Sequence, residues 1–93
     1  MKVYWNEQLL AESNNTIVVD NNHYFPPESL DMKYFKTSDK TSRCPWKGTA
    51  SYYSIIVDDE VNKDAAWYYS EPKEAAMDIK DRVAFWRGVK IIE

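Results

Sequence analysis

Short runs of β-branched and aromatic residues, broken by polar and turn-forming residues, set the pattern along this chain. Runs of this kind are typical of β-strands. The first three runs have short polar connections between them, which predicts an antiparallel meander. They are Lys2–Trp5, Leu9–Glu12 and Thr16–Asp20. Asn21 and Asn22 favour a further turn after them, because asparagine tolerates positive φ.

The longest β signal is Thr49–Val57, and Ala65–Tyr69 follows it as a second strand. Together they predict a hairpin whose loop, Asp58–Asp64, is longer than the tight two-residue kind. By contrast, Thr37–Ser42 shows no strong period and is expected to form a polar loop.

The register of this hairpin decides which aromatic side chains share a face. A hairpin axis near Val61 would place Ile55 opposite Trp67, and Tyr53 opposite Tyr69. Because side chains alternate along a strand, one face would then carry a polar-tipped aromatic set. Its members would be Ser51, Tyr53, Ile55, Trp67 and Tyr69. The other face is also aromatic, so we expect the sheet to be covered on both sides or to line a concavity.

One helix is expected, late in the chain, over the segment KEAAMDIK from Lys73 to Lys80. Ser70 or Glu71 can cap its start, and Pro72 sits in its first turn. Its apolar stripe is narrow and made of small residues, which indicates a helix lying over a sheet edge or face.

The end of the chain predicts a second hairpin, formed by Val83–Trp86 and Val89–Ile92 around Arg87 and Gly88. All the strands are too short and too closely spaced for parallel crossovers. We therefore expect a single domain, residues 1–93, that is mainly β with one short helix. Its antiparallel sheets would fold on each other as a sandwich or a partly open barrel.

Composition narrows the classes of function. Aromatic residues make up 15% of the chain, and such side chains suit the walls of a wet pocket. Two glycines are too few for a glycine-rich phosphate loop. The net charge of −3 argues against nucleic-acid binding. A single cysteine, with neither a signal peptide nor a membrane-spanning run, fits a soluble, cytoplasmic protein.

The segment RCPWKG, Arg43–Gly48, carries the densest side-chain chemistry. Pro45 and Gly48 predict a bent entrance to the long strand. Lys47 either reaches along the surface to solvent or offers its ammonium to a carboxylate or phosphate ligand.

Cys44 lies in the same segment between two positive residues, Arg43 and Lys47. Positive neighbours favour the reactive thiolate, so a nucleophilic role is conceivable if His23, the one histidine, acts as the base. The alternative is a small buried hydrophobic residue, which is how free cysteines usually behave.

Three strings in the chain resemble a known family: HYFPPESL, CPWKGTASYYS and NKDAAWYYSEPKEAAMDIKDRVAFW. Together they are similar to domain-of-unknown-function family 427, across essentially the whole chain. The resemblance implies a β-tent-like fold, in which two antiparallel sheets meet at a steep angle. Other β-tent families bind a structural zinc through four cysteines. Here only Cys44 and His23 are available, so neither a metal nor a cofactor is expected.

The same family is sometimes labelled nucleotidyltransferase-like. The paired acidic signature after Gly-Ser that such enzymes need is not visible in this sequence. The resemblance therefore supplies a fold and no catalytic residues.

The sequence leads to the hypothesis of a β domain that binds a small polar or anionic molecule. Its pocket would lie where the Arg43–Gly48 loop meets the aromatic face, closed by the segment around His23. The proposed ligand-binding residues are His23, Tyr24, Arg43, Trp46, Lys47, Tyr53, Trp67 and Tyr69.

Two alternatives remain open at this point. One is a small enzyme that uses Cys44 as a nucleophile or redox thiol. The other is a non-catalytic interaction module, a monomer or weak homodimer that presents an exposed aromatic patch.

Overall fold

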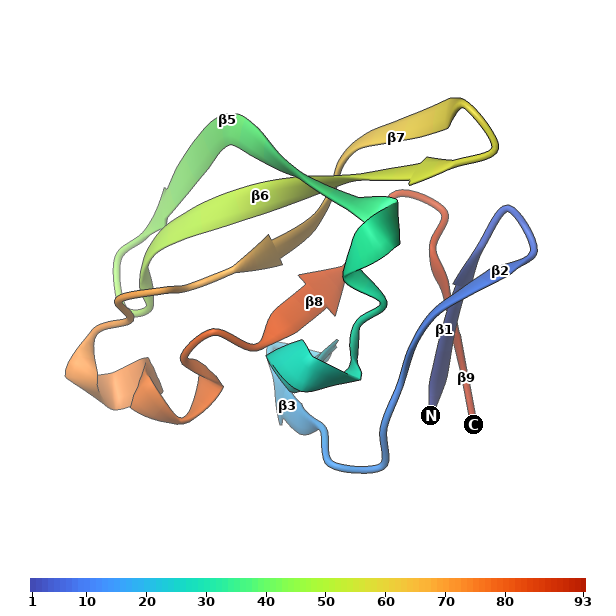
Figure 1. The fold of residues 1–93 in the computed structure, drawn as a ribbon. Coiled ribbons are helices and arrows are strands. Elements are labelled where there is room, and N and C mark those ends of the chain that lie inside the picture. Colours follow the sequence, from blue (N-terminus) through green and yellow to red (C-terminus); the bar gives the residue numbers. More distant parts are fainter.

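The computed structural model describes residues 1–93 as three antiparallel sheets with three short 3₁₀ segments (Figure 1). This confirms the expected mainly β class with antiparallel sheets. The strands are β1 Lys2–Trp5, β2 Gln8–Glu12, β3 Ile17–Val19, β4 Asn22–Tyr24, β5 Phe35–Cys44, β6 Gly48–Val57, β7 Glu60–Tyr68, β8 Val83–Phe85 and β9 Lys90–Ile92; the 3₁₀ segments are η1 Pro27–Ser29, η2 Met32–Tyr34 and η3 Glu74–Ile79.

The largest sheet has four strands in the order β5-β6-β7-β8. Its edge strand β5 runs through Thr37–Ser42, where the sequence pattern predicted a loop. The prediction was wrong because an edge strand that is mostly exposed has no apolar face to reveal it. Its pairing with β6 is also interrupted by a bulge between Thr37 and Thr41, which breaks the alternation.

The β6–β7 hairpin is real, but its turn is tight. Asp58 and Asp59 alone connect the strands, with φ of 49° and 66°. Positive φ at both central residues is the geometry of a two-residue hairpin turn. The longer Asp58–Asp64 loop and the register derived from it were therefore wrong. The observed pairs place Tyr52 opposite Trp67 and Ile56 opposite Val61, with a bulge between Tyr53 and Ile55.

The two ends of the chain build the second sheet, of order β2-β1-β9. β1 pairs with β2 as expected, but β3 pairs with β4 rather than extending the meander. The predicted C-terminal hairpin does not form, because β8 joins β7 and β9 joins β1. Positive φ at Arg87 and Gly88 redirects the chain from one sheet to the other. Figure 1 shows both termini beside this sheet, far from the η3 turn.

The predicted helix is a short 3₁₀ segment, η3, with a kink at Ala76. No side chain caps it, so the roles assigned to Ser70 and Glu71 were wrong. Both ends are fixed to the large sheet by backbone hydrogen bonds. The amide of Lys73 donates to the Lys47 carbonyl, and that of Asp81 donates to the Tyr69 carbonyl. Between these anchors the non-helical backbone of Ala76, with φ −120° and ψ 21°, interrupts the helix.

Two core clusters cover the two faces of the four-stranded sheet, as the aromatic character of both faces predicted. One cluster of 11 residues joins this sheet to the β2-β1-β9 sheet and contains Val3, Leu10, Ile55 and Phe85. The other, of 7 residues, lies beneath η3 and the β3–β4 hairpin. Its members are Tyr24, Ala50, Tyr52, Tyr69, Ala76, Ile79 and Ala84. None of the helical segments has the length and apolar character that a membrane span requires.

Candidate functional site

Lys47 is held inside the loop between β5 and β6, with only 10% of its side chain exposed. Its ammonium donates to the Asp20 carboxylate, with Nζ 2.7 Å from Oδ2. Nζ also lies 5.2 Å and 5.9 Å from the ring centroids of Trp46 and Tyr69. Burial by itself lowers the pKa of Lys47, but the hydrogen bond to Asp20 and the nearby tyrosines outweigh it and raise the pKa above its ordinary value. Lys47 is therefore a fixed positive charge.

Local backbone contacts explain why this lysine turns inward. Gly48 has a φ of 111°, a conformation that L side chains rarely adopt, and it bends the chain into β6. Lys73, just before η3, holds this loop in place through two hydrogen bonds. The Lys73 amide bonds the Lys47 carbonyl at 2.9 Å, and the Lys73 ammonium bonds the Pro45 carbonyl at 2.6 Å.

A cavity of about 180 Å³ opens beside the Lys47 side chain. We call it the aromatic recess, and it is lined by Lys47, Tyr52, Trp67, Tyr69 and Trp86. The rings of Trp67 and Trp86 meet edge to face, with centroids 5.9 Å apart. The ring centroids of Tyr52 and Trp86 are 6.5 Å apart.

Most of the polar tips of these aromatic residues are already paired. Trp67 Nε1 donates to the Tyr24 hydroxyl at 3.1 Å, and Trp86 Nε1 donates to the Asp64 carbonyl at 2.6 Å. The Tyr52 hydroxyl shares a hydrogen bond with Ser42. The two indoles therefore offer their rings, and not their N–H groups, to whatever enters.

Tyr69 is the exception. The residue as a whole is only 5% exposed, but its hydroxyl is open to the recess and is not sealed in the core, because every buried polar side-chain atom of the protein has a hydrogen-bond partner. Burial raises the pKa of this hydroxyl to about 12, against the opposing influence of Lys47. The group is therefore a neutral hydrogen-bond donor at ordinary pH. The recess holds two free donor groups side by side, the Tyr69 hydroxyl and the remaining N–H bonds of Lys47.

Several residues expected in a site do come together here. Lys47, Trp67 and Tyr69 line the recess, and Tyr24 lies behind Trp67 as its hydrogen-bond partner. Burial raises the pKa of Tyr24 as well. Trp46 contacts the Lys47 ammonium from outside and is 42% exposed, so it borders the recess without lining it.

Two other expected residues lie elsewhere. Tyr53 is on the opposite face of β6, where it stacks on Tyr68 with ring centroids 4.7 Å apart. His23 neighbours Tyr24 on β4, so its side chain points to the opposite side of the strand. It pairs with the Thr16 hydroxyl through Nδ1 at 3.0 Å.

Cys44 ends β5 and is half-buried against the second core cluster. Because His23 points away from that cluster, the structure does not bring the thiol and the imidazole together. No group of three His, Cys, Asp or Glu side chains is arranged to hold a metal ion.

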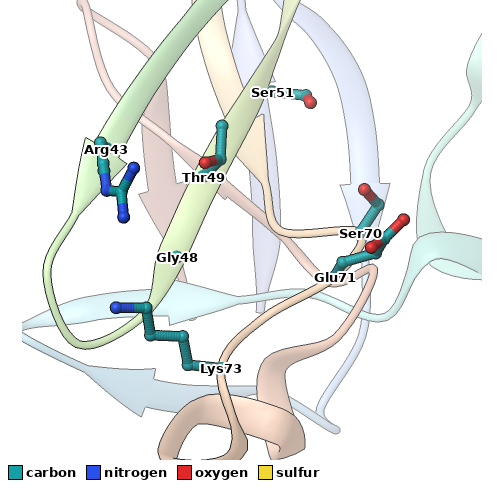
Figure 2. Close-up of a pocket in the computed structure, with 7 residues that line it drawn as sticks. All are labelled: Arg43, Gly48, Thr49, Ser51, Ser70, Glu71 and Lys73. Atoms are coloured by element: carbon teal, nitrogen blue, oxygen red, sulfur yellow. The ribbon is translucent and has the colours of Figure 1, made fainter.

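Arg43 lines a different cavity, of about 410 Å³, on the other side of the β5–β6 hairpin end (Figure 2). Its walls come from the end of β5, the start of β6 and the segment before η3. They contain no apolar side chain, and the charged ones are exposed. Water already satisfies such groups, so this trough lacks the combination of apolar walls and placed polar groups found in the aromatic recess.

Tyr52 and Trp86 are functional candidates that the sequence pattern missed. Tyr52 was assigned to the wrong face because the hairpin loop was taken as too long. Trp86 was placed in a terminal hairpin that does not form. A two-residue turn at Asp58-Asp59 is the signal that would have corrected the first of these errors.

Comparison with known proteins identifies the chain at the level of family. None of the curated proteins compared with it is a match. A family model described as a domain of unknown function (DUF427) matches residues 1–92. That match covers almost the whole chain, and it agrees with the resemblance carried by the CPWKGTASYYS string. The chain belongs to the DUF427 family.

Proposed function

We propose that this protein binds a small polar molecule in the aromatic recess. The observation that carries the proposal is the Tyr69 hydroxyl, which opens into the recess beside Lys47, is held protonated and forms no side-chain hydrogen bond with the protein. A polar group that opens into an apolar-walled recess and bonds no protein group is available to a ligand. A ligand acceptor that enters the recess would provide the missing partner.

The dimensions of the recess indicate the size of the ligand. Its volume is about 180 Å³, and an apolar cavity of about 150 Å³ accommodates benzene. The indole rings of Trp67 and Trp86 form part of the wall. Sites of this kind combine apolar walls with a few placed polar groups. A single planar ring with one polar substituent fits both the volume and the chemistry.

The recess accounts for more of the structure than the alternatives do. An enzyme that uses Cys44 would need a base beside the thiol, and His23 points away from it. Cys44 packs as a small apolar residue in the second core cluster. An interaction surface would draw on Trp46 and Trp86, but Trp86 is fixed through its indole N–H and forms a wall of the recess.

The test is a screen of small metabolites by thermal shift and by quenching of tryptophan fluorescence, which Trp67 and Trp86 would report. Hits should bind wild-type protein and bind Tyr69→Phe about fivefold more weakly, because one hydrogen bond to a ligand contributes roughly 1 kcal/mol. Tyr53→Phe is the matched control, since Tyr53 lies on the opposite face of β6. It should leave affinity unchanged. A broad set with no binder, or hits that bind Tyr69→Phe as tightly as wild type, would overturn the proposal.

A further inference from the structure

We infer that the ligand of the aromatic recess is an anion, a single planar ring that carries a carboxylate or an equivalent acidic group. This inference rests on the proposed function and names its ligand class. It is drawn from the distribution of charge around the recess and from the hydrogen-bonding groups inside it.

Positive charges gather on the rings of the recess, although the chain as a whole carries a net charge of −3. Lys40 Nζ lies 5.4 Å from the centroid of Tyr52, and Arg87 Cζ lies 4.5 Å from that of Trp86. Lys47 Nζ lies 5.9 Å from the centroid of Tyr69. Three of the four aromatic walls therefore carry a cation of the protein itself.

The carboxylates nearby do not cancel this charge. Asp20 pairs with Lys47, but it is 57% exposed and reaches the ammonium from the solvent side. Asp64 lies in β7 next to Trp86, and its carboxylate accepts a hydrogen bond from Ser38. Neither Lys40 nor Arg87 forms an ion pair. The surroundings of the recess thus hold three cations and two carboxylates.

A cationic ligand is disfavoured by the same contacts. Aromatic faces attract cations through their quadrupole, and rings grouped around a cavity commonly bind quaternary ammonium groups. Here the faces of Tyr52 and Trp86 already hold Lys40 and Arg87. The third cation, Lys47, lies within the recess and would repel a positive guest.

The groups free to bond a ligand can both donate a hydrogen bond. They are the Tyr69 hydroxyl and the N–H bonds of Lys47 that Asp20 leaves unused. A carboxylate has only acceptors and can take both at once, and hydrogen bonds between charged partners are stronger than neutral ones. A neutral amide of the same shape could accept the same hydrogen bonds, but it would lack the negative charge that attracts Lys47.

The experiment compares three probes of similar shape: benzoate, benzamide and benzyltrimethylammonium. Binding to the full chain is measured by tryptophan fluorescence and calorimetry at low and moderate salt. We expect benzoate to bind about tenfold or more tightly than benzamide, because charge-assisted hydrogen bonds are roughly twice as strong. Added salt should narrow this gap, and benzyltrimethylammonium should not bind.

Variants identify the source of the preference. Lys47→Met should remove most of the difference between benzoate and benzamide. Lys40→Gln alters only an exposed side chain and should weaken benzoate several-fold without affecting benzamide, which keeps the test valid if Lys47→Met folds poorly. Lys36→Met is the control, because Lys36 lies on β5 at a cavity away from the recess.

The outcomes separate the two claims. Equal binding of benzoate and benzamide, or tightest binding of the ammonium probe, would overturn the anion inference and leave the proposed function intact. Binding of none of the three probes would count against the recess as a site for single-ring ligands and so against both.

Discussion

Lys47 is one of two buried charged residues in the chain, and its burial has a structural consequence as well as a chemical one. An unpaired buried ammonium is costly, so the Asp20 carboxylate is required to hold it in place. Asp20 begins the turn between β3 and β4, whereas Lys47 ends the loop before β6. The ion pair therefore fastens the β3–β4 hairpin to the large sheet at the mouth of the recess.

Gly48 is the residue whose replacement should disturb this loop most. Alanine at a φ of 111° is strained, although its Cβ would meet only ordinary contacts at 3.5 Å with the backbone of Glu71 and Lys73. We expect Gly48→Ala to lower the free energy of unfolding by about 1–2 kcal/mol, measured by urea titration. Gly88→Ala is the comparison, because Gly88 has a φ of 81° with open space around it. Alanine is strained at both positions, but the loss at Gly88 should be smaller because its φ lies closer to the left-handed region that L residues can reach. An unchanged free energy of unfolding in Gly48→Ala would contradict a strained backbone at Gly48.

At the scale of elements, the turn of the β6–β7 hairpin determines which side chains line the aromatic recess. Shifting a strand by one residue moves every side chain to the other face. The Asp58-Asp59 turn lacks the Asn-Gly or Asp-Gly signature that marks a two-residue loop. Trp67 and Tyr69, both proposed from the sequence, therefore line the recess together with Tyr52, whereas the proposed Tyr53 lies on the opposite face.

The strain in that turn can be relieved by mutation. Asp59 has a φ of 66°, where glycine pays no steric cost but aspartate does. Glycine relieves the strain of the folded turn, but it also raises the entropy of the unfolded chain, which opposes the gain. We expect Asp59→Gly to raise the free energy of unfolding by a net amount of about 0.5 kcal/mol. Urea titration or differential scanning calorimetry would measure it.

The matched control is Asp39→Gly, an exposed aspartate in the edge strand β5. Glycine within a strand is unfavourable, so this change should destabilise the protein. If Asp59→Gly also destabilised it, the assignment of a left-handed turn would be contradicted.

At η3 the prediction from local sequence pattern failed for a different reason. The Lys73–Lys80 composition favours a helix, and two of the expected stripe residues, Ala76 and Ile79, are buried as predicted. The anchors at Lys73 and Asp81 fix the length of the segment, and they belong to contacts with Lys47 and Tyr69. Tertiary contacts of this kind override propensity over so short a stretch.

At the scale of the whole molecule, local pattern indicated most strands and the β1–β2 and β6–β7 pairs, but not the pairs between distant strands. β1 and β9 pair across nearly the full length of the chain, and β8 pairs with β7 across the η3 turn. Such contacts between distant residues leave no mark on hydrophobic periodicity, which reports only burial of a face. The class of fold was predictable for this reason, whereas the order of strands within the sheets was not.

The pH dependence of stability is a property of the whole molecule that follows from the buried phenols. Burial raises the pKa of Tyr24, Tyr53 and Tyr69, that of Tyr69 to about 12 from an ordinary value of 10.0. Below about pH 10 these groups are protonated in both the folded and the unfolded chain, so their contribution is constant. Between about pH 10 and 12 the unfolded chain releases these protons first, and the free energy of unfolding falls as pH rises. The raised pKa of Lys47 acts in the same direction.

We therefore expect urea titrations to give constant stability from about pH 7 to 9 and a steep decline above about pH 10. Tyr69→Phe removes one of the contributing groups, so its decline should be shallower than that of wild type. Absorbance of tyrosinate, followed on the folded protein, should show the most resistant phenol titrating near pH 12 in wild type and missing in Tyr69→Phe. Parallel declines in the two proteins would show that the Tyr69 hydroxyl is not shielded in the recess, which would also remove the observation on which the binding proposal rests.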